Sequence, residues 1–381
     1  LKQIYTLTYI DMDAFLEWYR QQNPKKSKST YDAMKYNYIR IRKTMCCSET
    51  DLSDLNEDDF VDINSIVNKI YPEFSLNTTI QSCLGIKYYC LFRGFKEGII
   101  KDCDSCLKTL IKDKNEIIEK NELTDNERDN WVDYPVLQEK MKQYHQYTIR
   151  KDFPVPDGMV DMDKKLQQMR NFTMLGMYTF LPPTRIGNYQ KMVVRYTQDG
   201  NIKKPHKSFA KKHNYLFIDE GDKYRDFTIV FNQYKTAKHL GQIIVKLEKG
   251  KSVHGDGGMT YEMLDDYVRF RRQYFKSMTR TKQHPYLFFN LNSQKEMLTG
   301  NNYTGILQQT AKEIVGKKLS VNLLRHIYIT HFLKKESSIQ DKTIIAEFMG
   351  QGYTPTMLEK YNRVNLGMGV AEEVDKIYDQ M

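Results

Sequence analysis

The chain has 381 residues and a mass of 45.2 kDa, which suits two domains better than one small module. Apolar residues make up 40% and charged residues 28%, and no run approaches the roughly 18 apolar residues that a transmembrane helix needs. Gly and Pro are too scarce for a collagen-like or low-complexity chain, and an aromatic content of 12% argues against disorder. We therefore expect globular domains and no membrane segment.

Charge is distributed unevenly along the chain. The net charge is +10 and the isoelectric point is about 9.0. Residues 1–125 hold 18 Lys and Arg against 20 Asp and Glu, so the remaining 40 basic and 28 acidic residues fall in 126–381. Such a surplus in one domain favours a polyanionic partner, although a merely soluble basic protein would show it as well.

Basic residues also cluster near the N-terminus, just before an acidic stretch from Glu49 to Asp62. The cluster consists of Lys25, Lys26, Lys28, Lys35, Arg40, Arg42 and Lys43. A basic helix face beside an acidic loop is typical of one DNA-facing side and one solvent-facing side. These seven residues are therefore candidates for DNA binding.

All the cysteines lie in the first part of the chain. They are Cys46, Cys47, Cys83, Cys90, Cys103 and Cys106. The Cys103-Asp-Ser-Cys106 spacing matches half a zinc site, but Cys46-Cys47 is a poor second half and no nearby His completes it. The sequence therefore predicts no metal and no other cofactor. Reduced thiols indicate an intracellular protein of the cytoplasm or nucleus rather than a secreted one.

The spacing of apolar residues predicts a helical domain at residues 1–125. Two sets of residues have the i, i+3, i+4, i+7 spacing of one helix face. They are Met12, Phe15, Leu16 and Tyr19, and Ile63, Ile66, Val67 and Ile70. Further helices are expected at 80–95 and 106–118, and the polar stretch 121–135 places the domain boundary near residue 125.

The second domain, residues 126–381, is predicted to mix helices and strands. Helices are expected at 137–150, 161–180, 259–278, 303–315, 320–335, 340–349 and 355–361, with an amphipathic terminal helix at about 366–381. The β-rich runs at 215–218, 227–231 and 243–247 predict a small three-stranded antiparallel sheet. The expected fold class is therefore α+β, mainly α.

The most informative segment runs from Ser320 to Leu333, where Arg325 and His326 interrupt an otherwise apolar helix. The pattern indicates a partly buried arginine. A buried arginine needs an anionic partner, which is either a ligand or a carboxylate of the same chain. The segment alone leaves both choices open.

Three other segments carry polar residues beside predicted helix ends or strands. Arg185 follows a Pro-Pro break and opens a helix, and Lys235 lies in the loop between the second and third predicted strands. Gly350 ends a helix, and Tyr361 lies in a following helix that Thr354 can cap. Each feature is weak alone, but their order along the chain is informative.

In this order the residues resemble the catalytic part of the tyrosine recombinase (phage integrase) family, over roughly residues 160–365. That family has an Arg in a helix-opening segment, a Lys on a β-hairpin, a His-x-x-Arg-His motif, a Leu-Gly-His motif or its Trp variant, and then a nucleophilic Tyr. The matching residues are Arg185, Lys235, Arg325, Met349-Gly350 and, ten residues after Gln351, Tyr361. Residues 1–125 are similar to the family's core-binding domain only in size and helical character.

The resemblance implies a site-specific DNA recombinase or integrase that cleaves and rejoins DNA through a 3′-phosphotyrosine intermediate, without metal or ATP. It assigns Tyr361 as the nucleophile, Lys235 as the general acid for the departing 5′ oxygen, and the two arginines to the phosphate. Paired guanidinium groups suit this task because they stabilise charge on non-bridging oxygens. Tyr353 and Lys238 are the alternatives for the nucleophile and the acid, and Lys238 is also a DNA-binding candidate.

Two positions depart from the family pattern. Asn322 stands where the family has its first His, and Gln351 stands where it has the later His or Trp. Amides can donate a hydrogen bond to a phosphate oxygen, but they cannot carry a proton at neutral pH. Activity survives if these catalytic candidates only hold the phosphate, and it falls if a base must deprotonate Tyr361. These departures make a catalytically decayed DNA-binding relative one alternative. A type IB topoisomerase, which shares the same chemistry on one DNA strand, is the other.

The expected partners are double-stranded DNA and further copies of the chain. Family members dock a terminal helix on the neighbouring subunit, so the resemblance implies a dimer to tetramer on DNA through residues 366–381. Packing of this helix on its own domain is the alternative. The abundance of Lys, Asn, Ile and Tyr indicates AT-rich coding, as in a mobile element or a virus.

Overall fold

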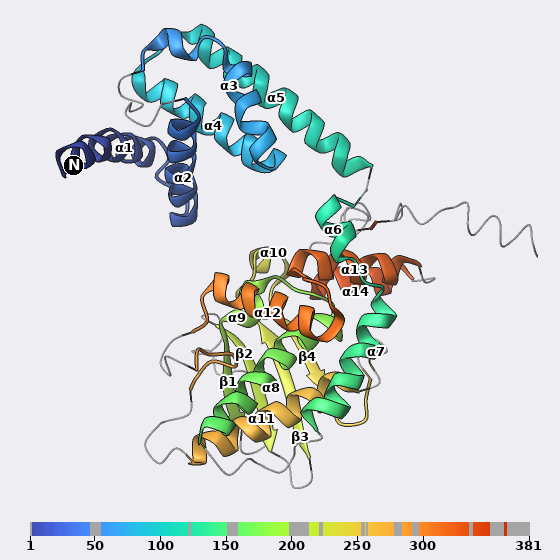
Figure 1. Cartoon of the computed structure of the whole chain (residues 1–381). Helices are drawn as coiled ribbons and strands as arrows, with labels where there is room; N and C mark the ends of the chain where they lie inside the picture. The colour runs from blue at the N-terminus through green and yellow to red at the C-terminus, as the bar shows by residue number, and fades with distance from the viewer. Residues whose placement is uncertain are drawn as a thin grey trace, which may run out of the picture. The chain divides into compact units, whose positions relative to one another are not determined.

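A computed structural model divides the chain into two compact units, Leu1–Lys120 and Asn121–Met381. Figure 1 shows the helices and strands of each unit. The residues whose structure is described are 2–45, 55–120, 123–150, 159–197, 213–220, 224–252, 256, 258–277, 284–291, 297–334, 338–350 and 362–363. No helix within these ranges is both long and apolar enough to cross a lipid bilayer.

The first unit is built from helices. They are α1 (Lys2–Gln22), α2 (Lys28–Met45), α3 (Ile63–Ile70), α4 (Leu76–Arg93) and α5 (Glu97–Glu119), with short 3-10 turns at Glu57–Phe60 and Tyr71–Glu73. All eight residues of the two predicted apolar faces are buried, so the helical periodicity is confirmed. Local signals also set the helix ends. Ser75 caps α4 by accepting a hydrogen bond from the Thr78 N–H, and Gly94 ends that helix with a φ of +69°.

Four cysteines lie in the core of this unit, on the neighbouring helices α4 and α5. The buried free thiols are those of Cys83, Cys90, Cys103 and Cys106. A hydrogen bond with Cys106, together with burial, raises the pKa of Cys83, which makes that thiol unreactive. Cys46 and Cys47 lie outside the described residues. Within the described ranges, no three His, Cys, Asp or Glu side chains group closely enough to hold a metal ion.

The second unit combines helices with one small sheet (Figure 1). Before the sheet come α6 (Asp125–Asn130), α7 (Tyr134–Tyr144), a π-helical turn (His145–Ile149), α8 (Met159–Thr179) and α9 (Ile186–Gln190). The sheet region contains β1 (Met192–Thr197), β2 (Asn214–Glu220), β3 (Arg225–Phe231), α10 (Ala237–Leu240) and β4 (Ile243–Leu247). The last helices are α11 (Met259–Ser277), α12 (Gly300–Val315), α13 (Val321–Lys334) and α14 (Ile339–Phe348). The chain is thus mainly helical with one small sheet, whereas the predicted helices at 355–361 and 366–381 lie outside the described residues.

The sheet differs from the prediction. It has four strands in the order β1-β2-β3-β4, and it is mixed because β1 pairs with β2 in parallel while the other pairs are antiparallel. The three predicted strands are present as β2, β3 and β4, and their antiparallel pairing is confirmed. The prediction of a wholly antiparallel three-stranded sheet is wrong, because β1 adds a fourth strand in parallel. The missed strand is the short run Met192-Val-Val-Arg-Tyr-Thr197. A parallel partner needs a long connection, so the sequence beside β1 carries no hairpin signal.

This topology brings several strand ends to one edge of the sheet. Parallel pairing aligns Met192, the first residue of β1, with Asn214, the first residue of β2. Antiparallel pairing places the end of β3 beside the beginning of β2 and aligns Phe231 with Ile243, the first residue of β4. The segments that flank these ends therefore meet at that edge. They are α9, which precedes β1, and the loop between β3 and β4.

Candidate active site

Helix α13 carries the predicted Arg-His pair through the interior of the second unit. Every side chain from Leu323 to Thr330 is buried, and Arg325 is only 1% exposed. Arg325 is thus buried more deeply than the sequence pattern indicates, because α13 packs against both α7 and α8. A guanidinium in such surroundings needs hydrogen-bond partners, since an unpaired buried charge is costly.

A hydrogen bond joins Arg325 to the segment that carries Arg185. The Nη1 atom of Arg325 donates to the carbonyl oxygen of Pro183 at 3.0 Å. Arg185 follows two residues later, in extended backbone just before α9, and its side chain is partly exposed. The phenol of Tyr178 is also close: burial raises its pKa well above the usual range, and the charge of Arg325 acts in the opposite direction. The two predicted arginines therefore belong to segments that touch.

A second contact joins the loop of Lys235 to the end of α14. The Thr236 hydroxyl donates to the carbonyl oxygen of Gly350 at 2.6 Å. Gly350 has a φ of +67°, and a Cβ atom there would lie 3.0 Å from the ring of Tyr234. Both the backbone conformation and the close approach therefore require glycine. Lys235 is exposed in this loop, and so is Lys238 in α10.

Aromatic side chains connect these two contacts through the core. The ring centroids of Tyr189 in α9 and Phe231 at the end of β3 are 5.5 Å apart, and those of Phe231 and Phe348 in α14 are 6.0 Å apart. Figure 1 shows α9, α10, α13 and α14 at the same end of the sheet. The segments gathered there are those of Arg185, Lys235, Arg325 and Gly350.

Arg363, which the sequence pattern does not single out, is anchored on α13. Its backbone N–H donates to the Thr330 Oγ1 at 2.9 Å, and its Nη2 lies 3.3 Å from the His326 Nε2. The Oε1 of Glu127 in α6 lies 3.9 Å from the same Nη2 and 3.7 Å from the imidazole nitrogen. Burial lowers the pKa of Arg363, and the charge of Glu127 opposes this shift. The only sequence signal for Arg363 is that it follows Tyr361 by two residues.

The remaining catalytic candidates are placed only in part. Asn322 is exposed on α13, one turn before Arg325. Gln351, Tyr353 and Tyr361 lie outside the described residues. The described residues thus bring together the segments of both arginines and the lysine.

Most of the predicted DNA-binding residues of the first unit are accessible. Those exposed or partly exposed on α2 or just before it are Lys25, Lys26, Lys28, Lys35, Arg42 and Lys43. Lys28, Lys35 and Arg42 recur at seven-residue intervals, which is close to two helical turns. They therefore share one flank of α2.

Arg40 lies on the other flank of α2 and faces its own unit. Its Nη1 donates to the Ser82 Oγ at 2.7 Å, and its guanidinium lies 4.9 Å from the centre of the Phe74 ring. Burial lowers the pKa of Arg40. These contacts give Arg40 a structural role that the sequence cluster does not reveal.

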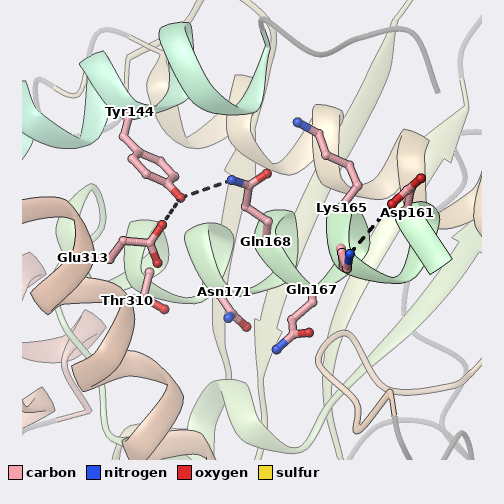
Figure 2. A pocket seen from close by; sticks show the side chains of 9 residues that line it. Tyr144, Asp161, Lys165, Gln167, Gln168, Asn171, Thr310 and Glu313 are labelled. Atoms are coloured by element: carbon pink, nitrogen blue, oxygen red, sulfur yellow. Dashed lines mark hydrogen bonds and ion pairs between the residues drawn. The ribbon is translucent and has the colours of Figure 1, made fainter. Parts of the chain in front are cut away.

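A separate pocket of about 560 Å³ is lined by residues of α7, α8 and α12. Figure 2 shows Tyr144 in this pocket, where its hydroxyl donates to the Glu313 Oε1 at 2.6 Å and accepts from the Gln168 Nε2 at 3.3 Å. Burial and the hydrogen bond to Glu313 raise the pKa of Tyr144 to about 12. Two carboxylates, Asp161 and Glu313, and two lysines, Lys164 and Lys165, line the pocket, so their charges balance. None of the predicted site residues lines it.

Comparisons with known proteins give little further guidance. No protein-family model matches the chain, and no curated protein matches it. Among solved structures, the crystal structure of XerA recombinase is similar, with a TM-score of 0.35 and 11% sequence identity over 98% of both chains. Because that TM-score marks a distant similarity, the function is inferred from the residues of this chain.

Proposed function

We propose that the chain is a site-specific DNA recombinase or integrase that forms a covalent bond between Tyr361 and a 3′ phosphate of duplex DNA. The observation that carries this proposal is the convergence of three segments distant in sequence, those of Arg185, Lys235 and Arg325. Packing of a core does not require three cationic residues at one end of a sheet. Strand transfer does, because one phosphate must be held, neutralised and supplied with a proton.

The residue types suit attack on a phosphodiester. Non-bridging oxygens repel a nucleophile, and the guanidinium groups of Arg185 and Arg325 would stabilise their charge in the pentacoordinate transition state. The phenol of Tyr361 would lose its proton to water, and its oxygen would bond to phosphorus while the bond from phosphorus to the 5′ oxygen breaks. The ammonium of Lys235 would give that oxygen a proton. Because the phosphotyrosine conserves the bond energy, rejoining needs no ATP, and the arginines supply the neutralisation.

The anchored Arg363 is close in sequence to Tyr361, the proposed nucleophile. Arg363 is hydrogen-bonded to Thr330, on the same helix as Arg325. Two residues of chain span at most about 7 Å, so Tyr361 would be within reach of the helix of the proposed catalytic arginine. Tyr353 follows Gly350 by three residues, and Gly350 is bound to Thr236 beside Lys235, so chain length does not separate the two tyrosines. Tyr361 is preferred because its spacing of ten residues after Gln351 matches the resemblance.

The burial of Arg325 sets a condition on catalysis. With an exposed fraction of 1%, its guanidinium can reach a phosphate oxygen only when the groups that cover it move aside. Arg185 is partly exposed and can make the first phosphate contact. We therefore expect the site to assemble in two steps, with Arg185 engaged before Arg325.

Both units would take part in DNA binding. The first would act as the helical clamp and the second as the catalytic domain, and affinity that comes from phosphate contacts should fall steeply with salt. Residues 366–381, which lie outside the described ranges, would join copies into dimers to tetramers on DNA. Deletion of these residues with no change in the stoichiometry of the DNA complex would contradict this part of the proposal.

Covalent capture of DNA tests the proposed function. The protein is incubated with a pool of nicked duplexes whose sequence is randomised around the nick, so that cleavage releases a short fragment and traps the adduct. Denaturing electrophoresis should show a DNA–protein adduct with the wild-type chain and with Tyr353→Phe, and none with Tyr361→Phe. An adduct that survives Tyr361→Phe, or no adduct with the wild type, would contradict the proposal.

The captured sequence then separates the alternatives. Strand exchange between two duplexes that carry it supports a recombinase. Relaxation of a supercoiled plasmid of unrelated sequence, without exchange, indicates a type IB topoisomerase. DNA binding with no adduct indicates a relative whose catalysis has decayed.

A further inference from the structure

A single buried amide connects α9 with the loop between β3 and β4. Asn214, the first residue of β2, is 1% exposed. Its Nδ2 donates to the carbonyl oxygens of Asn188 at 2.9 Å and Gln233 at 3.0 Å. Its Oδ1 accepts from the backbone N–H groups of Asn232 at 2.8 Å and Gln233 at 2.7 Å. Both donor hydrogens and both acceptor positions of the amide are therefore used.

The mixed sheet puts Asn214 in this position. Because β1 closely follows α9 and runs parallel to β2, the first residue of β2 lies beside the end of α9. Because β3 runs antiparallel to β2, the same residue also lies beside the end of β3, where the loop begins. An antiparallel β1 would have placed α9 at the other edge of the sheet, away from the loop.

The loop is held on both sides of Lys235. On one side, Gln233 is bound to Asn214 through its N–H and its carbonyl. On the other side, Thr236 is bound to the carbonyl oxygen of Gly350. The Lys235 side chain is itself exposed, so the backbone that carries it determines where its ammonium can reach.

We propose that Asn214 is a positioning residue that fixes the Lys235 loop relative to Arg185. The ammonium of Lys235 is thereby directed to the 5′ oxygen of the phosphate that Arg185 binds, and this inference rests on the proposed function of the same site. Asn214 is buried and acts through the loop rather than on DNA. A displacement of about 1 Å at a catalytic group can cost roughly 10²-fold in rate.

The leaving group distinguishes this role from a general loss of structure. In a duplex with a 5′-bridging phosphorothiolate, sulfur replaces the 5′ oxygen and the leaving group is a thiolate. A thiol has a pKa of about 8.5, so the thiolate leaves without a general acid. The normal 5′ alkoxide needs one. Asn214→Ala should slow adduct formation on the normal duplex by about 10- to 100-fold and react with the phosphorothiolate duplex at close to the wild-type rate. Lys235→Ala should show the same selective rescue after a larger loss of about 10²- to 10⁴-fold. Arg185→Ala should slow both reactions.

Gln190→Ala is the matched control. Gln190 is another buried amide, and its Nε2 donates to the Leu298 carbonyl oxygen at 2.5 Å rather than accepting or donating in the way of Asn214. This variant should change the rate of adduct formation by the same factor on both duplexes. If Asn214→Ala slows adduct formation equally on both duplexes, or on neither, the proposal is overturned. Asn214→Ser, which keeps a hydroxyl group at this position, is compared in the same way if the alanine variant does not fold.

Two outcomes of this experiment separate the role of Asn214 from the proposed function. If the wild type forms no Tyr361-dependent adduct, the proposed function is lost. If the wild type forms the adduct but the Asn214 variants show no dependence on the leaving group, only the role of Asn214 is lost.

Discussion

The two units differ in what their interiors contain. Among the described residues of the first unit, the buried polar side chains are uncharged and belong to Asn37, Thr79 and Ser82. The second unit also buries charged side chains, namely Lys165, Arg170, Asp256, Asp266, Arg271 and Arg325. A buried charge costs far more than a buried hydroxyl or amide unless it is paired. The second unit is therefore the part of the chain in which polar networks determine the structure.

Buried charge serves two different purposes in the second unit. The Oδ2 of Asp266 lies 2.9 Å from the His145 Nε2 and accepts from the Arg150 Nε at 2.9 Å, which ties α11 to the π-helical turn. Arg325 instead donates to the backbone beside Arg185. Burial of charge alone thus does not identify an active site, whereas convergence with other reactive groups does.

Replacing Asp266 tests the structural side of this comparison and should have the largest effect. Asp266→Asn keeps the side-chain shape but removes the charge that pairs with His145, Arg150 and Arg269. The free energy of unfolding of the second unit, measured with urea, should fall by about 3 kcal/mol. Glu262→Gln on the same helix is the control, because its pair with Arg150 is half exposed and should contribute less than about 1 kcal/mol. Equal losses in both variants would contradict the distinction.

The same carboxylate predicts how stability responds to acid. Burial acts to raise the pKa of Asp266, but hydrogen bonds and charges from His145 and Arg150 outweigh it and lower the pKa to about 2. Since an unfolded Asp titrates near about 3.9, this contribution is complete above about pH 4 and is lost as the pH falls toward 2. Circular dichroism should therefore show a shallower loss of stability over this range in Asp266→Asn. If the stability of Asp266→Asn falls with pH as steeply as that of the wild type, other groups cause the acid response.

Exchanging buried arginines tests the functional side. Arg325→Ala removes a guanidinium that is proposed to contact the transition state, so adduct formation per folded molecule should slow by about 10²- to 10³-fold. Arg170→Met removes another buried arginine, which donates to the Phe289 carbonyl oxygen at 2.9 Å. It should lower thermal stability and leave that rate unchanged. Rates are compared at a temperature where both variants are folded, and a similar slowing in both would mean that burial rather than position explains the effect.

The sequence predicts the helices better than the sheet, for a physical reason. A helix repeats its contacts every three to four residues, so the faces from Met12 to Tyr19 and from Ile63 to Ile70 are visible locally. A strand depends on a partner from elsewhere in the chain. The strand β1 has six residues and a parallel partner, so nothing beside it in sequence reveals the pair.

The residues of the candidate site also differ in how well the sequence predicts them. Charged residues at a helix start, in a loop or within an apolar helix stand out in sequence, and Arg185, Lys235 and Arg325 are of this kind. Asn214 and Arg363 do not stand out, because their contacts join segments that only the folded unit brings together. Such supporting residues can be recognised only in the folded structure.

The smallest effect on DNA binding or stability is expected in the first unit, from substitutions on the two flanks of α2. Lys28→Ala and Lys35→Ala each remove one proposed phosphate contact, so the slope of log affinity against log salt should decrease by about 0.9 for each. Arg40→Ala instead loses the hydrogen bond to Ser82 and the contact with Phe74, which should destabilise the unit by about 1 kcal/mol and leave the slope unchanged. A reduced slope in Arg40→Ala alone would place DNA on the opposite flank, because only a side chain that exchanges counterions for phosphate changes this slope.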